Sequence, residues 1–166
     1  MKRLSSIIIV LLLFQTAYSQ GRAFKTSKYA GTYILGNVRS NNGGASIEVY
    51  PESDSTVLFY VHIQRGAPSH NSGRLYGRMR ILDGSGLFNT KFDFLENSCR
   101  WKITITSKAF ILTTVNNQYD CAFGNGVVAD GEYKKISSKK PECFVQGDGQ
   151  KVYFAKVKPE KYYDTL

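Results

Sequence analysis

Apolar and polar residues alternate with a period of two along much of this chain, and no long stretch has the period of an amphipathic helix. The alternation is clearest in Thr56–Gln64, Arg74–Leu82, Leu87–Phe94 and Cys99–Thr106. A strand that alternates in this way has one face in a core and the other in water. The residues predicted to point inward are Val57, Phe59, Val61, Ile63, Leu75, Gly77, Met79, Ile81, Phe88, Thr90, Phe92, Phe94, Cys99, Trp101, Ile103 and Ile105.

Four further stretches are predicted to be strands: Tyr29–Gly36, Ala45–Tyr50, Ala109–Val115 and Lys151–Val157. Short turn sequences separate the strands, and Asp83-Gly84 is the strongest hairpin signal among them. About eight strands in meander order result. An all-β, eight-stranded antiparallel barrel is the preferred architecture, because closure removes the sheet edges. A β-sandwich is the alternative, since counting strands does not distinguish the two.

The remaining segments are expected to be irregular. Residues 133–150 are polar, basic and without a period, which predicts a long loop, and residues 158–166 are predicted to form a frayed tail. At the other end, Lys2 and Arg3 precede an apolar run from Ile7 to Phe14 and a small-residue site at 17–19. This pattern predicts a signal peptide over 1–19 and cleavage before Gln20. Residues 20–166 are then one domain, secreted or periplasmic, with no membrane span.

The charge of the chain is strongly basic. Lys and Arg number 22 against 13 Asp and Glu, and without Lys2 and Arg3 the balance of 20 against 13 gives +7. Such a surface favours anionic partners. For an exported protein we expect a protein or an anionic glycan rather than nucleic acid. The oligomeric state stays open.

Three cysteines, Cys99, Cys121 and Cys143, allow at most one internal disulfide. We predict Cys99–Cys121, because the two residues bracket a hairpin-like segment. A disulfide that closes a loop of this size stabilises the fold by about 3 kcal/mol, because it reduces the conformational entropy of the unfolded chain. Cys143 is expected to be free.

Signals for catalysis are few. His62 lies within a predicted strand and His70 in a loop, and no zinc-binding or nucleophile motif accompanies them. A lone strand histidine is typical of a surface or rim position. We therefore predict neither enzyme activity nor a cofactor or metal, and an enzyme is the weakest of the functional hypotheses.

A stripe of basic residues is the main candidate for binding. Arg74, Arg78 and Arg80 share the outer face of one strand with Tyr76, and Lys91, Arg100 and Lys102 follow on the next two strands. Neighbouring strands lie about 4.8 Å apart, so these side chains are predicted to form one patch for an acidic partner. The alternative is an ordinary solvated face. Aromatic residues on the inner face are expected to fill the barrel rather than to line a ligand cavity.

One segment points to a family. The sequence Cys121–Tyr133, with Tyr29–Tyr33 and Cys99–Ile103, resembles small exported bacterial β-barrel proteins of the lysozyme-inhibitor-like kind. The shared pattern is C-x-F-G-x-G-V-x-x-D-G-x-Y. The resemblance implies turn or bulge positions at Gly124, Gly126 and Gly131, a disulfide at Cys121 and a packing role for Tyr133.

The resemblance also implies an inhibitory loop with a Ser-Gly pair, for which Ser72-Gly73 is the match, followed by Arg74. A cationic lysozyme would repel a partner of charge +7, so the resemblance bears on fold and location more than on activity. We expect an exported, non-enzymatic binding protein. The alternatives are an inhibitor of a lysozyme or other cell-wall hydrolase, and a binder of an anionic glycan or protein through the basic face.

Overall fold

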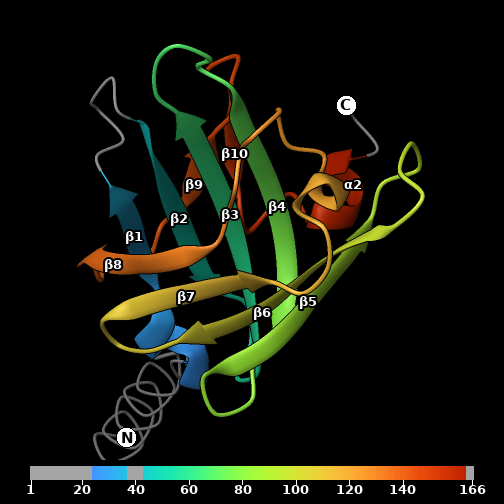
Figure 1. Cartoon of the computed structure of the whole chain (residues 1–166). Coiled ribbons are helices and arrows are strands. Elements are labelled where there is room, and N and C mark those ends of the chain that lie inside the picture. Colours follow the sequence, from blue (N-terminus) through green and yellow to red (C-terminus); the bar gives the residue numbers. More distant parts are fainter. Residues whose placement is uncertain (1–23, 37–42, 164–166) are drawn as a thin grey trace, which may run out of the picture.

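Eight antiparallel strands form a single sheet that curves into a nearly closed barrel (Figure 1). The computed structural model describes residues 24–36 and 43–163, so the predicted signal peptide lies outside the described residues. The strands are β1 (Gly31–Gly36), β2 (Gly43–Pro51), β3 (Thr56–Arg65), β4 (Ser72–Arg80), β5 (Ser85–Lys91), β6 (Ser98–Ile105), β7 (Ala109–Thr114) and β8 (Gly131–Ser137).

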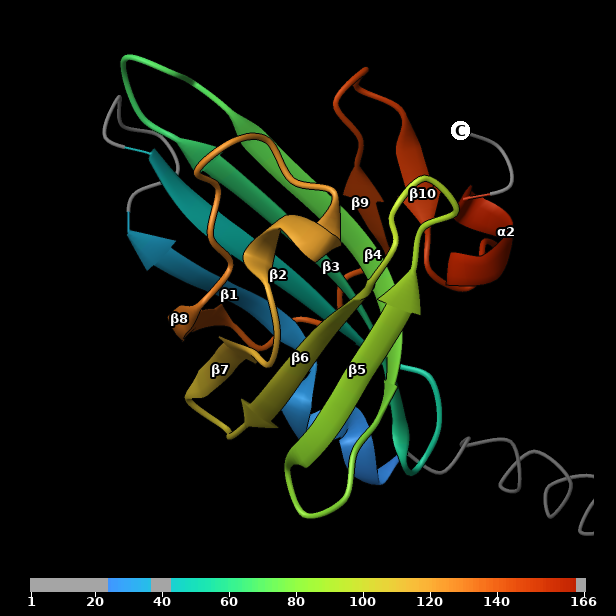
Figure 2. The same ribbon diagram turned by 45° about the vertical axis from the view of Figure 1, so that its right-hand side comes forward.

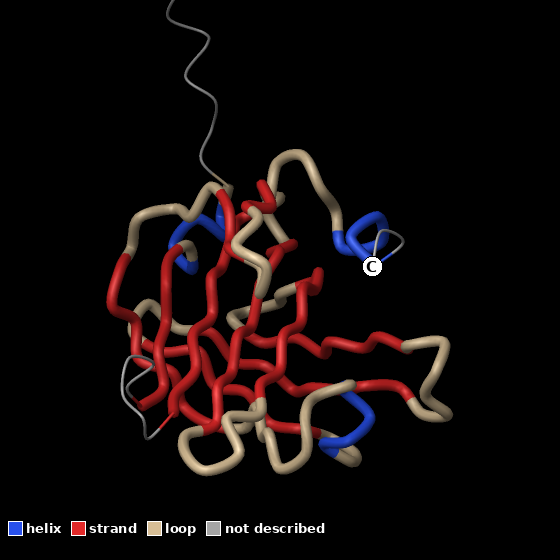
Figure 3. The backbone as a smooth tube through the Cα atoms, turned by 90° about the horizontal axis from the view of Figure 1, so that it is seen from above, coloured by secondary structure: helices blue, strands red, loops and turns tan. Residues whose placement is uncertain are grey.

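The strand order is β4-β3-β2-β1-β8-β7-β6-β5, so β8 returns to pair with β1 and joins the two halves of the meander. The predicted eight-stranded antiparallel barrel is confirmed, rather than the two packed sheets of a sandwich. Viewed from above, the strands surround an interior and the C-terminal helix lies outside them (Figure 3).

The barrel is incompletely closed between β4 and β5. Asp83 and Gly84 have φ values of 49° and 80°, which are the positive values that a two-residue hairpin turn requires. The Leu82–Ser85 bridge closes this turn, but no ladder joins β4 to β5 in the described structure. The predicted turn is therefore present, but it joins two sheet edges instead of a paired hairpin.

The interior of the barrel is packed with aromatic side chains. Trp101 is fully buried, and its ring centroid lies 5.4 Å from that of Phe88 and 6.3 Å from that of Phe59. The inward faces predicted for β3 and β6 are confirmed, since Val57, Phe59, Val61, Ile63, Cys99, Trp101, Ile103 and Ile105 all belong to this core. Phe94 is the exception at 76% exposed, because β5 ends at Lys91, before that residue.

The chain after β8 forms a cover on the outside of the barrel, where the sequence predicted a loop and a frayed tail. The eighth barrel strand is Gly131–Ser137, not the predicted Lys151–Val157. A hairpin of β9 (Cys143–Val145) and β10 (Lys151–Tyr153) is followed by the helix α2 (Pro159–Tyr163). Strands of three residues are too short to show a period, and therefore the alternation missed them.

The cover buries the outer surface of β2, β3 and β4, which we call the covered face (Figure 2). Phe144 stacks on Tyr60 with ring centroids 3.9 Å apart, and Phe154 stacks on Tyr50 at 5.3 Å. A second core therefore lies outside the barrel. Its buried members are Leu58, Tyr60, Tyr76, Phe144, Val152, Phe154 and Tyr162.

The described residues also form two short 3-10 helices. The helix η2 (Lys25–Tyr29) precedes β1 and places Tyr29 in the barrel core. The helix η3 (Gln118–Cys121) lies between β7 and β8, where a disulfide holds it against β6.

Candidate functional site

Ser72 and Gly73, predicted to lie in a protruding loop, are the first residues of β4. Gly73 pairs with Ile63 of β3 and is buried. A Cβ atom at Gly73 would lie 2.6 Å from the ring of Phe123, so this glycine is needed for close packing. Ser and Gly carry no apolar side chain that would extend the alternation, and the sequence therefore gave no sign that the strand begins here.

The predicted basic residues of β4 do not form an open patch. Tyr76 is 1% exposed and packs against Phe154 and Tyr162 of the cover. Arg78 is bound in ion pairs with Glu52 and Glu160. Arg74 and Arg80 are exposed, at opposite ends of the strand. The alternation correctly predicted that Tyr76 points away from the barrel core. It did not predict that the cover packs over this side chain.

The ion pairs of the covered face fasten the cover to the barrel. Glu52 accepts a hydrogen bond of 2.8 Å from Arg78 Nε and one of 2.8 Å from Lys158 Nζ. Burial alone would raise the pKa of Glu52, but these hydrogen bonds and charges outweigh it and hold the pKa below its usual value. The hydrogen bond to Glu52 raises the pKa of Arg78. These charges are therefore engaged within the protein.

A tyrosine of the cover occupies the open edge of β4. The Tyr76 backbone N–H donates to the Tyr163 hydroxyl at 2.9 Å, and that hydroxyl donates to the Tyr76 carbonyl at 3.0 Å. On its other side, the Tyr163 ring lies 5.6 Å from the ring of Phe92, just beyond β5. The helix α2 thus lies where a β4–β5 ladder would otherwise form. The predicted basic stripe is divided at this point.

The cations of the next two strands remain free. Lys91, Arg100 and Lys102 are exposed, on the outer side of β5 and β6. Arg100 is opposite Asn89, and Lys102 is opposite Leu87, which is 73% exposed. Within residues 24–36 and 43–163, none of these three cations belongs to an ion pair. We call them the β5–β6 cations.

Within the described residues no segment covers the outer surface of β5 to β8, and we call this surface the bare face (Figure 1). Its central positions on β7 and β8 are Ile111, Thr113, Glu132, Lys134 and Ile136, all exposed. Lys102 is opposite Thr113, and Ile111 is opposite Glu132. The surface is therefore continuous from the β5–β6 cations to β8.

A groove of about 530 Å³ lies at the lower end of the bare face, where β8 passes the β6–β7 turn. Lys108, Lys134 and Lys135 line it with one carboxylate, Glu132, and several serine hydroxyls. The Lys135 N–H donates to the Lys108 carbonyl at 2.8 Å, which fixes the turn against β8. We call this the lysine groove. The sequence analysis missed it, although Lys134-Lys135 and Lys139-Lys140 were visible, because the segment was assigned to a loop.

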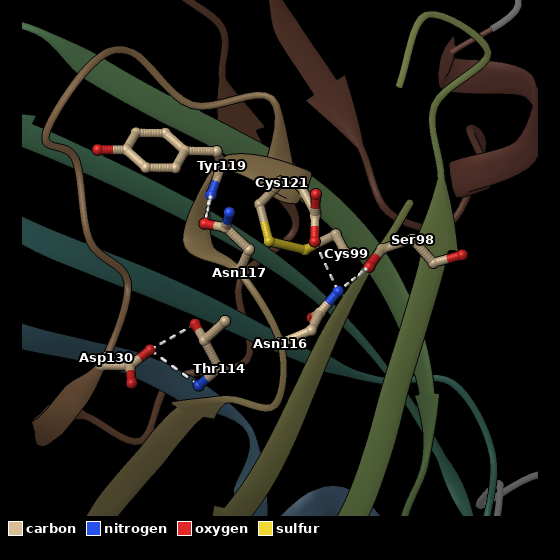
Figure 4. Close-up of a disulfide and its surroundings, with 9 residues drawn as sticks. Ser98, Cys99, Thr114, Asn116, Asn117, Tyr119, Cys121 and Asp130 are labelled. Atoms are coloured by element: carbon tan, nitrogen blue, oxygen red, sulfur yellow. Dashed lines mark hydrogen bonds between the residues drawn. A yellow bond between two sulfur atoms is a disulfide. The ribbon is translucent and has the colours of Figure 1, made fainter. Parts of the chain in front are cut away.

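The predicted disulfide Cys99–Cys121 is present with an S–S distance of 2.04 Å, and Cys143 is free (Figure 4). Beside it, the Asn116 side-chain amide donates to the Ser98 carbonyl at 2.6 Å and to Asp120 at 2.7 Å. Thr114 donates to Asp130 through both its backbone N–H and its hydroxyl. The disulfide and the Asn116 contacts hold η3 against the start of β6.

The positions that the resemblance assigned have definite structural roles. Gly126 has a φ of 71°, a left-handed conformation that other residues rarely adopt, and the Arg65 guanidinium lies over it. Tyr133 is fully buried and donates to the Ala129 carbonyl at 2.7 Å. The family itself stays a prediction.

Glu48 on β2 is the most unusual ionisable group of the covered side. Its Oε2 atom is buried and has no hydrogen-bond partner among the described residues. Burial raises the pKa of Glu48 to about 7, although a backbone hydrogen bond acts in the opposite direction. This carboxyl group is therefore sensitive to pH near neutrality.

His62 lies within β3 and His70 lies before β4. His62 is half-buried opposite Arg74, and burial together with the Arg74 charge lowers its pKa. His70 is exposed in the turn before β4. In the described ranges no three His, Cys, Asp or Glu side chains are placed to hold a metal ion. No helix of the described part is long and apolar enough to cross a membrane.

Comparison of the chain with known protein families, with curated proteins and with solved structures gives no match.

Proposed function

We propose that this protein is an exported, non-enzymatic binding protein that recognises an anionic ligand through the bare face. The observation that carries the proposal is the state of the β5–β6 cations. They are exposed and outside any ion pair of the described chain, whereas Arg78 on the covered face is held by two carboxylates. Free cations on an open sheet favour association with anions.

The filled interior supports recognition at the surface. Trp101, Phe59 and Phe110 are fully buried in the barrel core. The ring centroids of Trp101 and Phe110 lie 6.3 Å and 6.2 Å from that of Phe59. A barrel of eight strands is just wide enough for side chains to fill it or for one small ligand. Here the side chains take that space, so a ligand meets the outside of the sheet.

We propose no inhibitory role for Ser72-Gly73. Both residues belong to β4, and Gly73 lies beneath Phe123. The inhibitor alternative would therefore need another segment, and the bare face is the better supported binding surface.

A binding assay with a charge-reversed variant tests the proposal. Wild-type protein is titrated with a sulfated polysaccharide, a polyuronate and an acidic protein at low and physiological ionic strength. We expect binding that weakens with salt, because screening shortens to about 8 Å at 0.15 M. R100E/K102E is expected to lose roughly tenfold or more in affinity. R80E is the control, because Arg80 lies on β4, on the other side of the gap between β4 and β5. Binding that is equal in R100E/K102E and wild type would contradict the proposal.

A further inference from the structure

We propose that the ligand is a linear acidic polysaccharide that lies across the bare face and binds the β5–β6 cations and the lysine groove together. This inference rests on the proposed function and names its ligand class. It adds the groove as a second subsite, whose exposed cations are Lys108 and Lys134.

The separation of the two subsites argues for a polymer. Lys102 is opposite Thr113, and Lys134 is opposite Ala109, four residues further along β7. With strands about 4.8 Å apart and about 3.3 Å per residue, these two positions lie about 16 Å apart. That distance is about twice the screening length at physiological ionic strength. A compact anion therefore meets one subsite at a time, whereas an extended chain of anionic sugars meets both.

The surface between the subsites suits such a chain. Thr104, Ile111 and Thr113 present neutral side chains there, and among the described residues the carboxylate on this path is Glu132, opposite Ile111. Chain-like ligands gain affinity when a second site binds intramolecularly. The negative charge of Glu132 repels an anionic ligand and is expected to weaken its binding.

The groove itself has the properties of an anion subsite. Lysines outnumber carboxylates in its lining, and Ser107, Ser137 and Ser138 add hydrogen-bonding groups. The Lys135 ammonium group turns away from the bare face, because it lies 5.4 Å from the centroid of the Tyr33 ring and donates to the Lys28 carbonyl at 3.2 Å. Lys108 and Lys134 are the exposed cations of the groove.

The choice of a polysaccharide over single-stranded nucleic acid follows from the side chains. Nucleic acid bases bind single-strand sites largely by stacking on aromatic rings. The outward positions of β5 to β8 in the described structure carry no aromatic residue; they are Ser85, Leu87, Asn89, Lys91, Ser98, Arg100, Lys102, Thr104, Ile111, Thr113, Glu132, Lys134 and Ile136. Point charges of lysine suit scattered sulfate or carboxylate groups.

The test measures affinity against ligand length. Heparin fragments and oligogalacturonates, each as tetrasaccharide and dodecasaccharide, are titrated at physiological ionic strength by calorimetry or anisotropy. The two series distinguish sulfate from carboxylate recognition. For wild type, we expect the dodecasaccharide of at least one series to bind roughly tenfold or more tightly than the tetrasaccharide. The variant K108E/K134E is expected to lose most of this gain and to keep the tetrasaccharide affinity of the β5–β6 cations.

Two further variants sharpen the result. K151E/K161E makes the same change of net charge on exposed residues of the cover and is expected to bind like wild type. E132Q removes the opposing carboxylate and is expected to raise dodecasaccharide affinity by roughly twofold or more. Circular dichroism and thermal unfolding of each variant check that the barrel is intact.

The possible failures are distinguishable. If K108E/K134E binds the dodecasaccharide like wild type while R100E/K102E does not, the second subsite is wrong and the proposed function stands. If neither variant changes binding, both are wrong. If single-stranded DNA of matched charge binds more tightly than either polysaccharide, the ligand class is wrong.

Discussion

The two outer faces of this barrel are built from the same alternation of side chains, yet one is buried and the other is exposed to solvent. On the covered face the outward residues Leu58, Tyr60 and Tyr76 are at most 2% exposed, because β9, β10 and α2 pack over them. On the bare face the outward residues Leu87, Ile111 and Ile136 are 73%, 37% and 61% exposed. The comparison teaches that an outward position on a barrel strand is a surface only where no later segment returns to cover it.

Charge follows the same division. The three ion pairs found within the described residues join Arg78 and Lys158 to Glu52 and Glu160, all at the covered face. The cations of the bare face have no such partners in the part of the chain that the structure describes. Partly buried charges need paired carboxylates to offset their lost hydration, whereas charges in water do not. Charge on the first face therefore fastens the cover, and charge on the second is available to a ligand.

The largest predicted effect is a pair of truncations that compare the faces directly. Phe154→Ala removes a fully buried ring from the outer core and is expected to destabilise the protein by about 3–5 kcal/mol. Leu87→Ala removes an exposed side chain and is expected to change stability by about 0.5 kcal/mol or less. Urea unfolding of both variants measures this. Equal effects would show that the cover contributes little to folding.

A pH-dependent difference is predicted at Glu48. Its pKa is raised from 4.5 to about 7 in the folded protein, so the folded state binds this proton more tightly than the unfolded state does. The contribution of this group to stability is therefore complete at low pH and is lost as the pH rises from about 4.5 through 7. At pH 8 Glu48→Gln is expected to be more stable than wild type by up to about 3 kcal/mol, and the gain shrinks toward pH 5. Unfolding of both proteins across this range provides the measurement, and a gain that stays the same at every pH would contradict the assignment.

A smaller effect is expected at the open edge of β4. Tyr163→Phe keeps the ring but removes the hydroxyl that bonds the N–H and carbonyl of Tyr76. An unpaired buried backbone group costs about 1–3 kcal/mol, so stability is expected to fall by that amount. Hydrogen exchange of the Tyr76 amide is expected to accelerate. Unchanged protection of this amide would mean that the hydroxyl does not cap the strand.

The smallest effects distinguish paired from free charge. Arg78→Ala is expected to cost about 1 kcal/mol, near the top of the range for partly exposed ion pairs, because it loses two partners. Arg100→Ala is expected to cost close to zero, since an unpaired cation in water contributes little. Raising the salt concentration should reduce the Arg78 effect and leave the Arg100 effect unchanged. The comparison fails if Arg100→Ala is the more damaging of the two.

The sequence predicted the barrel well because its strands are long enough to show their period. Trp101 and its neighbours on β6 alternate over eight residues, and the inward face was identified correctly. The disulfide was also predictable, since three cysteines leave few pairings. By contrast, β9 and β10 have three residues each, and their pairing is set by contact with β3 and β4 rather than by a pattern of their own.

The candidate site was predicted only in part, for the same physical reason. Arg100 and Lys102 are exposed as the alternation indicates, because no described segment packs over the outer side of β6. Tyr76 and Arg78 follow the same alternation, but the outcome depends on residues some 80 positions later in the chain. The lysine groove required the pairing of β8 with β7, which brings Lys134 beside the turn that carries Lys108.

The local sequence thus determined which residues face the barrel core, where the Asp83-Gly84 turn falls and which cysteines pair, since these depend on backbone period, turn geometry and proximity along the chain. Only the tertiary structure decided which outer face is surface. Which face is covered depends on long-range packing of the C-terminal segment. Its aromatic side chains lower the free energy of the folded protein when they are removed from water and buried against Tyr60 and Tyr76. The cover thereby leaves β5 to β8 as the open side of the molecule.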